Sequence, residues 1–173
     1  MRIQVVPHDP AWRGRFGEES ERIADALGEI VIAVHHIGST SIPGIFAKPV
    51  IDILVEVANV DKVDERASAM NALRYEAMGE FGIPGRRYFR KDNEYGIRTH
   101  QVHVFEAGSD QATRHVGFRD YLIAHPEEAW AYSDLKRELA AVHPNDPEAY
   151  MDGKDAFIKQ IDRRASKWRR SIC

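Results

Sequence analysis

The spacing of apolar residues predicts a helix and two strands in the first third of the chain. Between residues 10 and 27 apolar side chains recur at helical spacing, and one face carries Trp12, Phe16, Ile23 and Leu27. Residues 30–37 are rich in β-branched side chains and predict a strand. Residues 49–57 form an apolar run that only Asp52 and Glu56 interrupt, which is typical of a central strand covered on both faces.

The middle of the chain predicts a helix followed by a hairpin. Apolar residues at helical spacing predict a helix over residues 60–77, and a glycine-rich loop follows at 79–85. Residues 87–91 and 98–105 predict two strands, and the short polar segment between them favours a hairpin.

The remainder of the chain is helical in pattern, with helices predicted over residues 112–124, 126–142 and 147–168. Proline follows Asp9, His125 and Asp146, and its missing N–H is tolerated in the first turn, so these pairs mark helix starts. Because no flexible linker divides the chain, we expect an α+β core over residues 1–108. A helical extension over residues 109–173 would pack on that core as one structural unit.

Composition limits the classes of partner. A net charge of −3 argues against bulk electrostatic binding to nucleic acid or to an anionic membrane. The one cysteine, Cys173, has no intrachain partner, which excludes a disulfide framework and favours a reducing compartment. The N-terminal residues lack the apolar run of a signal peptide, and no segment approaches the roughly 18 apolar residues of a membrane span. We therefore expect a cytoplasmic protein without a membrane partner.

The loop after the first predicted strand carries the most informative chemistry. A strand that ends in Gly38-Ser39 lets the backbone approach a phosphate, to which the hydroxyl and the exposed amides donate. The carboxylate of Asp52 lies in an apolar strand and needs a cation or several donors beside it. Together these residues predict one pocket for a triphosphate and a divalent metal, Mg²⁺ or Mn²⁺. A plain turn is the alternative for Gly38-Ser39.

These motifs resemble those of the nucleotidyltransferase superfamily, in which a Gly-Ser or Gly-Gly turn precedes an Asp-x-Asp/Glu strand. In more detail the chain resembles the GrpB family. The matching segments are His36–Thr40, Lys48–Ile53, Arg86–Lys91, Thr99–Val104 and Phe118–Leu122, with Tyr132 and Lys136, and Tyr150 and Lys154. The resemblance implies a minimal nucleotidyltransferase-like mixed β-sheet with a C-terminal helical extension. It also implies a transferase that moves a nucleoside monophosphate from a triphosphate to an acceptor.

The chain departs from the superfamily pattern beside Asp52. Val50 and Leu54 stand two positions to either side, so the second carboxylate of Asp-x-Asp is missing. Glu56 shares the strand face with Asp52 but lies roughly 13 Å away, too far to share one metal or a metal pair. Two alternatives therefore stay open. One is a catalytically degenerate module that binds a nucleotide or phosphate, and the other is a metal-dependent hydrolase that uses Asp52 with histidines.

Two histidines are predicted to lie beside this pocket. His36 precedes the Gly-Ser turn, and His103 shares a strand face with Gln101 and Phe105. Imidazole there would replace the missing carboxylate as a metal ligand or carry a proton near neutral pH. The candidate metal ligands are therefore Asp52, His36 and His103, and the candidate catalytic residues are Asp52 and His103. A strand histidine that is hydrogen-bonded to the backbone is the alternative.

Basic residues complete the predicted phosphate site, beginning with Lys48 in the second matching segment. On the predicted strand, Arg87 or Arg90 would hold phosphate oxygens through forked guanidinium contacts. The alternative for these arginines is a solvated edge strand whose charge blocks aggregation. Lys154 interrupts an apolar helical stripe, and Lys136 lies one turn after Tyr132. Each lysine either reaches a phosphate in the pocket or extends to the surface.

Overall fold

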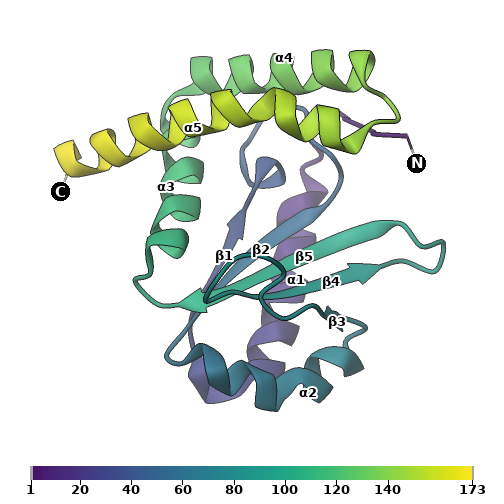
Figure 1. The fold of residues 1–173 in the computed structure, drawn as a ribbon, viewed down its shortest axis with the longest axis vertical. Helices are drawn as coiled ribbons and strands as arrows, with labels where there is room; N and C mark the ends of the chain where they lie inside the picture. The colour runs from purple at the N-terminus through teal and green to yellow at the C-terminus, as the bar shows by residue number, and fades with distance from the viewer. Residues whose placement is uncertain (1, 173) are drawn as a thin grey trace.

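The computed structural model describes residues 2–172, and across these residues it forms a five-stranded mixed sheet (Figure 1). The strands are β1 (Val31–Ile37), β2 (Ile51–Val57), β3 (Glu76–Ala77), β4 (Arg87–Asp92) and β5 (Arg98–Glu106). Their order across the sheet is β1-β2-β5-β4-β3. β2 and β5 are parallel, and the other three neighbouring pairs are antiparallel. The predicted hairpin of β4 and β5 and the interior position of β2 are therefore confirmed.

One face of the sheet is apolar and is covered by the N-terminal helix. Ile53 and Val55 of β2 point to this face with Val102 and Val104 of β5, as the alternation of a strand requires. Helix α1 (Ala11–Leu27) contributes its apolar stripe to the same core. The 3-10 helix η3 (Val60–Arg66) and helix α2 (Ala67–Ala72) complete the layer, which lies behind and below the sheet in Figure 1.

The opposite face meets the helical half of the chain. Helices α3 (Asp110–Ala124), α4 (Pro126–Val142) and α5 (Pro147–Ile172) follow one another along the chain. In Figure 1, α4 and α5 run alongside one another above the end of the sheet. Ile42 and Ile45, in the loop between β1 and β2, are fully buried among apolar side chains of these three helices. This loop therefore joins the sheet to the helical layer.

Local chemistry explains the helix starts. The Asp9 carboxylate accepts a hydrogen bond from the Ala11 amide at 2.9 Å, and the Asp146 carboxylate accepts one from the Ala149 amide at 3.1 Å. Each satisfies an amide that has no partner within its own helix. Both aspartates thus cap the helices whose starts the Asp-Pro pairs predict.

The prediction of one helix over residues 60–77 is wrong. Helix α2 ends at Ala72, and Arg74 adopts a left-handed backbone conformation with φ of 71°. That turn buries Tyr75, whose hydroxyl donates to the buried Glu19 carboxylate at 2.9 Å. The chain then continues into β3, which pairs with β4. The hydrogen bond of Tyr75 and the pairing of β3 with β4 are tertiary contacts, and they override the helical spacing of apolar residues in this segment.

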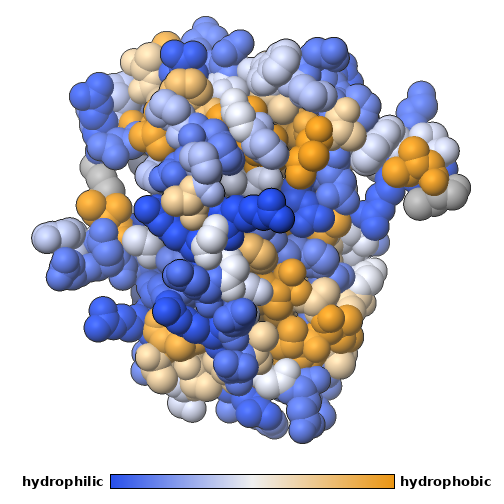
Figure 2. Space-filling view, turned by 180° about the vertical axis from the view of Figure 1, so that it is seen from behind, coloured by the Kyte–Doolittle hydropathy of each residue, from blue (hydrophilic) through white to orange (hydrophobic). Residues whose placement is uncertain are grey.

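The exterior is mixed in polarity. Figure 2 shows a band of strongly hydrophilic residues across the middle of the face opposite to Figure 1, and apolar residues gather below it. None of the helices within residues 2–172 combines the length and the apolar character needed to span a membrane.

Candidate functional site

A cavity of about 240 Å³ lies where the loop after β1, the strands β2 and β5, and the helices α4 and α5 meet. We call it the lysine cleft. Its lining residues are Ser39, Thr40, Lys48, Val50, Asp52, Gln101, Lys136, Tyr150, Met151 and Lys154. The expectation that Ser39 and Asp52 face a common cavity is therefore confirmed. The two helical lysines reach the same cavity, which the sequence left open.

Gly38 holds the loop against Asp52. Its backbone has φ of 73°, a left-handed conformation that favours glycine. A Cβ atom at this position would lie 2.5 Å from Oδ2 of Asp52. Ser39 to Ser41 form a 3-10 turn directly afterwards, and the Ser41 hydroxyl donates to the Gly38 carbonyl. The glycine is thus required by close approach to the carboxylate as well as by backbone conformation.

Lys136 carries a buried ammonium group. Its side chain is 2% exposed, and Nζ has no hydrogen-bond partner among residues 2–172. The ammonium lies over the ring of Tyr132, one helical turn earlier, at 4.4 Å from the centroid. Burial, together with the charge of the neighbouring Lys154, lowers the pKa of Lys136 to about 7. An unpaired buried lysine is rare because its desolvation must be compensated.

Lys48 and Lys154 approach the cleft from two other segments. Their Nζ atoms lie 4.4 and 4.5 Å from the centroid of the Tyr150 ring. Burial lowers the pKa of Lys154 to about 8, Lys48 contributes in the same direction, and Asp52 opposes both effects. The pKa of Lys48 is likewise lowered by burial and raised by Asp52. The cleft therefore sets three ammonium groups against one carboxylate.

The rings of Tyr132 and Tyr150 contact the ammonium groups of the lysines. Burial raises the pKa of Tyr132 to about 12, although the Ser39 hydroxyl beside it acts in the opposite direction. The buried Tyr150 hydroxyl has no hydrogen-bond partner within residues 2–172. Both tyrosines stay neutral at ordinary pH, so they add no negative charge to balance the lysines.

His103 lies next to Asp52, with Nε2 at 3.5 Å from Oδ1. Its other ring nitrogen, Nδ1, lies 3.3 Å from the guanidinium of Arg86. Because arginine only donates hydrogen bonds, Nδ1 must accept, and the proton of the neutral ring must therefore be on Nε2. That nitrogen then has no lone pair for a metal. The structure favours a role in orienting Asp52 over the predicted metal ligation by His103.

His36 lies on the other face of the sheet from Asp52. In the register of β1 and β2 it stands opposite Ile53, and its ring stacks on Phe16 at 4.8 Å. Its Nε2 lies 2.9 Å from the Thr40 hydroxyl, and burial lowers its pKa to about 4. The structure does not bring His36, His103 and Asp52 together. Within residues 2–172, no three His, Cys, Asp or Glu side chains form a group that could hold a metal.

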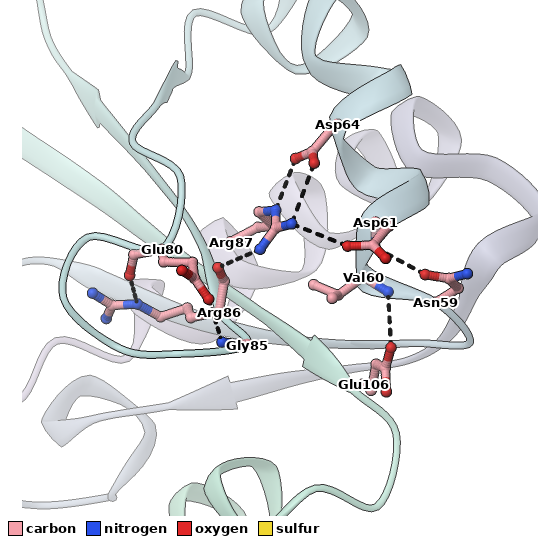
Figure 3. Close-up of polar contacts among 9 residues, drawn as sticks. All are labelled: Asn59, Val60, Asp61, Asp64, Glu80, Gly85, Arg86, Arg87 and Glu106. Carbon is pink, nitrogen blue, oxygen red and sulfur yellow. Dashed lines mark hydrogen bonds and ion pairs between the residues drawn. The ribbon is translucent and has the colours of Figure 1, made fainter.

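The predicted phosphate contacts of Arg87 and Arg90 need correction. Figure 3 shows the Arg87 side chain turned toward η3, where its guanidinium pairs with Asp61 and Asp64. Arg90 pairs with Glu76 on the edge strand β3 at 3.0 Å. Both arginines already have carboxylate partners, and neither lines the lysine cleft. The alternative of a charged edge strand does not hold either, because β4 lies between β5 and β3. Both arginines instead pair with carboxylates of the neighbouring elements η3 and β3.

Two residues near the site were not selected from the sequence. Arg86 is 8% exposed and donates to the carbonyl of Glu80 (Figure 3). It also donates to the carbonyl of Phe81, so the glycine-rich loop fixes its position. Gln101 lines the cleft because it stands opposite Asp52 in the parallel register of β2 and β5. Strand alternation predicts that Gln101 and His103 share a face of β5, and this pattern could have identified Gln101 as a residue of the site.

Comparisons with known proteins agree on one family. A family model described as GrpB protein matches residues 2–164. The chain is 44% identical over 169 residues to the UPF0157 protein YqkA of Bacillus subtilis (strain 168), covering 98% of this chain but 49% of that protein. It therefore spans about half the length of this relative. It is 36% identical over 162 residues to the glutamate-rich protein GrpB of Alkalihalophilus pseudofirmus, covering 92% of this chain and 93% of that protein.

A solved structure is similar over nearly the whole chain. It is the crystal structure of the conserved protein GrpB from Enterococcus faecalis, with a TM-score of 0.90 and 44% sequence identity. The match covers 95% of this chain and 98% of that one. The mixed α+β architecture is therefore shared with that protein.

Proposed function

This chain belongs to the GrpB family, and on that premise we propose that the lysine cleft binds the phosphate groups of a nucleoside triphosphate or of another phosphorylated small molecule. The observation that carries this proposal is the convergence of Lys48, Lys136 and Lys154 on one small cavity. The buried ammonium of Lys136 has no partner among the described residues. A phosphate supplies the negative charge and the acceptor oxygens that these groups lack.

The residues of the cleft suit the parts of such a ligand. The three lysines would neutralise the phosphate oxygens, and the Ser39 hydroxyl would donate to one of them. Asp52 would hold Mg²⁺ or Mn²⁺ together with phosphate oxygens, since one carboxylate plus substrate phosphates is a common Mg²⁺ environment. When bound, the metal would supply charge neutralisation at the phosphates. His103 would orient the Asp52 carboxylate through its Nε2–H group.

The reaction that we propose for this site is transfer of a nucleoside monophosphate to an acceptor. The acceptor oxygen would form a bond to the α-phosphorus while the bond to the pyrophosphate oxygen breaks, and pyrophosphate would leave. Lys136 and Lys154 would stabilise the charge that develops on the leaving pyrophosphate, as preorganised cations do at transferring phosphates. The acceptor proton would leave with solvent.

One observation favours a second candidate, a module that binds the ligand without turnover. The described structure places no second carboxylate beside Asp52, whose same-face neighbour along β2 is Leu54. The two-metal arrangement of phosphoryl-transfer enzymes needs ligands for a metal pair about 3.5–4 Å apart. Ligand binding is common to both candidates, so turnover is what separates them.

A thermal-shift screen of nucleoside triphosphates with and without Mg²⁺ or Mn²⁺ tests the proposal. Ligand at about 100 times its dissociation constant should stabilise the fold by about 2.7 kcal/mol. Lys136→Met and Lys154→Met should reduce that stabilisation. The matched control is Lys159→Met on the same helix α5, because Lys159 pairs with Asp155 at the surface and its side chain is 65% exposed. Pyrophosphate release in the stabilised samples supports the transferase, and stabilisation without release supports the binding module. No stabilisation by any phosphorylated compound would refute both.

A further inference from the structure

The size of the lysine cleft limits which part of a nucleotide enters it. The cavity measures about 240 Å³, whereas pockets that enclose a drug-sized ligand measure roughly 300–1,000 Å³. The cleft therefore accommodates a compact group and leaves a base and ribose outside. The lining residue Met151 is 52% exposed, which places it at the opening.

The cleft offers no free aromatic surface to a base. Tyr150 is the aromatic residue among the described lining residues, and the ammonium groups of Lys48 and Lys154 lie over its ring. Tyr132 lies under Lys136 and stacks on Phe157 with centroids 5.5 Å apart. Base recognition commonly uses an aromatic face for stacking. Here those faces hold the lysines in place instead.

The charge in the cleft is suited to an anion without a metal. Three lysines face the single carboxylate of Asp52. An anion in the cleft would favour their protonated forms, and these would provide the positive charge that a metal would otherwise supply. They enter from three separate segments, namely the loop before β2, helix α4 and helix α5. An oligophosphate has enough oxygens to contact all three at once.

From these observations we infer that the lysine cleft recognises the oligophosphate group itself, of the pyrophosphate type, without a divalent metal and without selecting the base. The inference rests on the proposed function and narrows it to a ligand class. Mg²⁺ at Asp52 would then serve transfer and not binding.

Isothermal titration of the full chain tests this inference with pyrophosphate, ADP, GDP and CDP, each in EDTA and again in Mg²⁺. We expect the dissociation constants of the four compounds to agree within about tenfold, which is one decade of affinity. We also expect all four to bind in EDTA. Lys136→Met and Lys154→Met should each weaken pyrophosphate binding by about tenfold or more, because each removes a charge-assisted contact. Lys159→Met should bind as the unmodified chain does.

The other results show whether the inference fails alone or together with the proposed function. If one diphosphate binds more than about tenfold tighter than pyrophosphate, the cleft selects the base and the inference fails while the proposed function stands. Binding that occurs in Mg²⁺ but not in EDTA would likewise overturn metal independence and leave the proposed function standing. Unchanged affinity in both lysine variants, with melting temperatures showing that they fold, would remove the lysines from the site. No binding of any compound would overturn the inference and the proposed function together.

Discussion

At the residue scale, Lys136 couples the stability of the fold to pH. Its pKa is about 7 in the folded chain and about 10.4 in an unfolded one, so the unfolded state binds more protons between these values. Stability therefore rises as pH increases from about 7 toward 10, because the proton that the amine must lose on folding is held less strongly by the unfolded chain as pH approaches its unfolded-state pKa. The groups facing this amine are Lys154, Lys48, Asp52 and Tyr132. Lys154 has a lowered pKa of about 8, so it also makes the fold more stable as pH rises.

Lys136→Met should remove the part of this dependence that comes from Lys136 and leave the part from Lys154. Near pH 7 the variant should melt at a higher temperature than the unmodified chain, since it buries no ammonium group, and the difference should shrink as pH approaches 10. Melting curves in a series of buffers measure both effects. Lys159→Met, which changes an exposed lysine, should shift the curves little at any pH. A constant difference between Lys136→Met and the unmodified chain would show that the amine does not titrate in the fold.

His103 gives a second prediction at this scale. Two-bond ¹H–¹⁵N correlation spectra should show its neutral ring protonated on Nε2, because Arg86 occupies Nδ1 as a donor. Arg86→Met should release the ring to a mixture of tautomers and should loosen Asp52. The rings of Tyr88 and His103 stack at 5.4 Å and keep the imidazole in place in the variant. An Nδ1–H tautomer in the unmodified chain would contradict the proposed role in orienting Asp52.

At the scale of elements, the loop between β1 and β2 supplies a matched pair of glycines. Gly38 and Gly44 both have left-handed backbones, with φ of 73° and 78°. A Cβ at Gly38 would collide with Asp52, whereas a Cβ at Gly44 would meet nothing within 4 Å. The pair therefore separates backbone strain from steric collision.

Gly44→Ala should destabilise the fold by about 1–2 kcal/mol, the usual penalty for a left-handed alanine. Gly38→Ala should cost more than that. It should also weaken phosphate binding, since relief of the collision with Asp52 would shift the adjacent Ser39, whose hydroxyl lines the cleft. Chemical denaturation gives the stabilities, and pyrophosphate titration gives the affinities. Equal losses in the two variants, with binding unchanged, would mean that Gly38 serves the turn alone.

Helices α4 and α5 meet closely at Gly153, immediately before Lys154. A Cβ there would lie 2.5 Å from Cδ2 of Leu139 on α4. Gly153→Ala should therefore separate the helices that carry Lys136 and Lys154, destabilise the fold by about 1–3 kcal/mol through overpacking, and weaken phosphate binding. Leu139→Ala added to it should restore part of the binding.

The control for this prediction is another helical glycine, Gly17 of α1, where an added Cβ would meet nothing within 4 Å. Gly17→Ala should stabilise the fold by about 0.5–1 kcal/mol through helix propensity alone. A similar gain from Gly153→Ala would show that α4 and α5 separate without penalty.

At the scale of the whole molecule, the sequence predicted elements and local chemistry better than it predicted partners across the fold. Ser39 and Asp52 were found because a Gly-Ser turn and a carboxylate in an apolar strand are local anomalies. Lys154 was found because it interrupts an apolar stripe. Lys48 entered through family resemblance, since nothing in its own neighbourhood distinguishes it.

The errors share one physical origin. Strand alternation places Arg87 and Arg90 on opposite faces, but it cannot show that Asp61, Asp64 and Glu76 lie opposite them in the folded chain. These acidic residues belong to η3 and β3, in the segment where one continuous helix was expected. The prediction that His36 lies beside Asp52 is wrong for a related reason. Its closeness in sequence to the Gly-Ser turn does not determine which face of the sheet its side chain occupies.

The assembly of the lysine cleft from distant segments has a consequence for the timing of its formation. Ser39, Lys48 and Asp52 leave the ribosome long before Lys154, which lies 102 residues after Asp52 in the chain. At typical translation rates that interval lasts roughly 5–20 s. During this interval Gly38 and Asp52 have left the ribosome, but Lys154 of α5 has not. We therefore expect a nascent chain to capture a phosphorylated ligand only after helix α5 has docked.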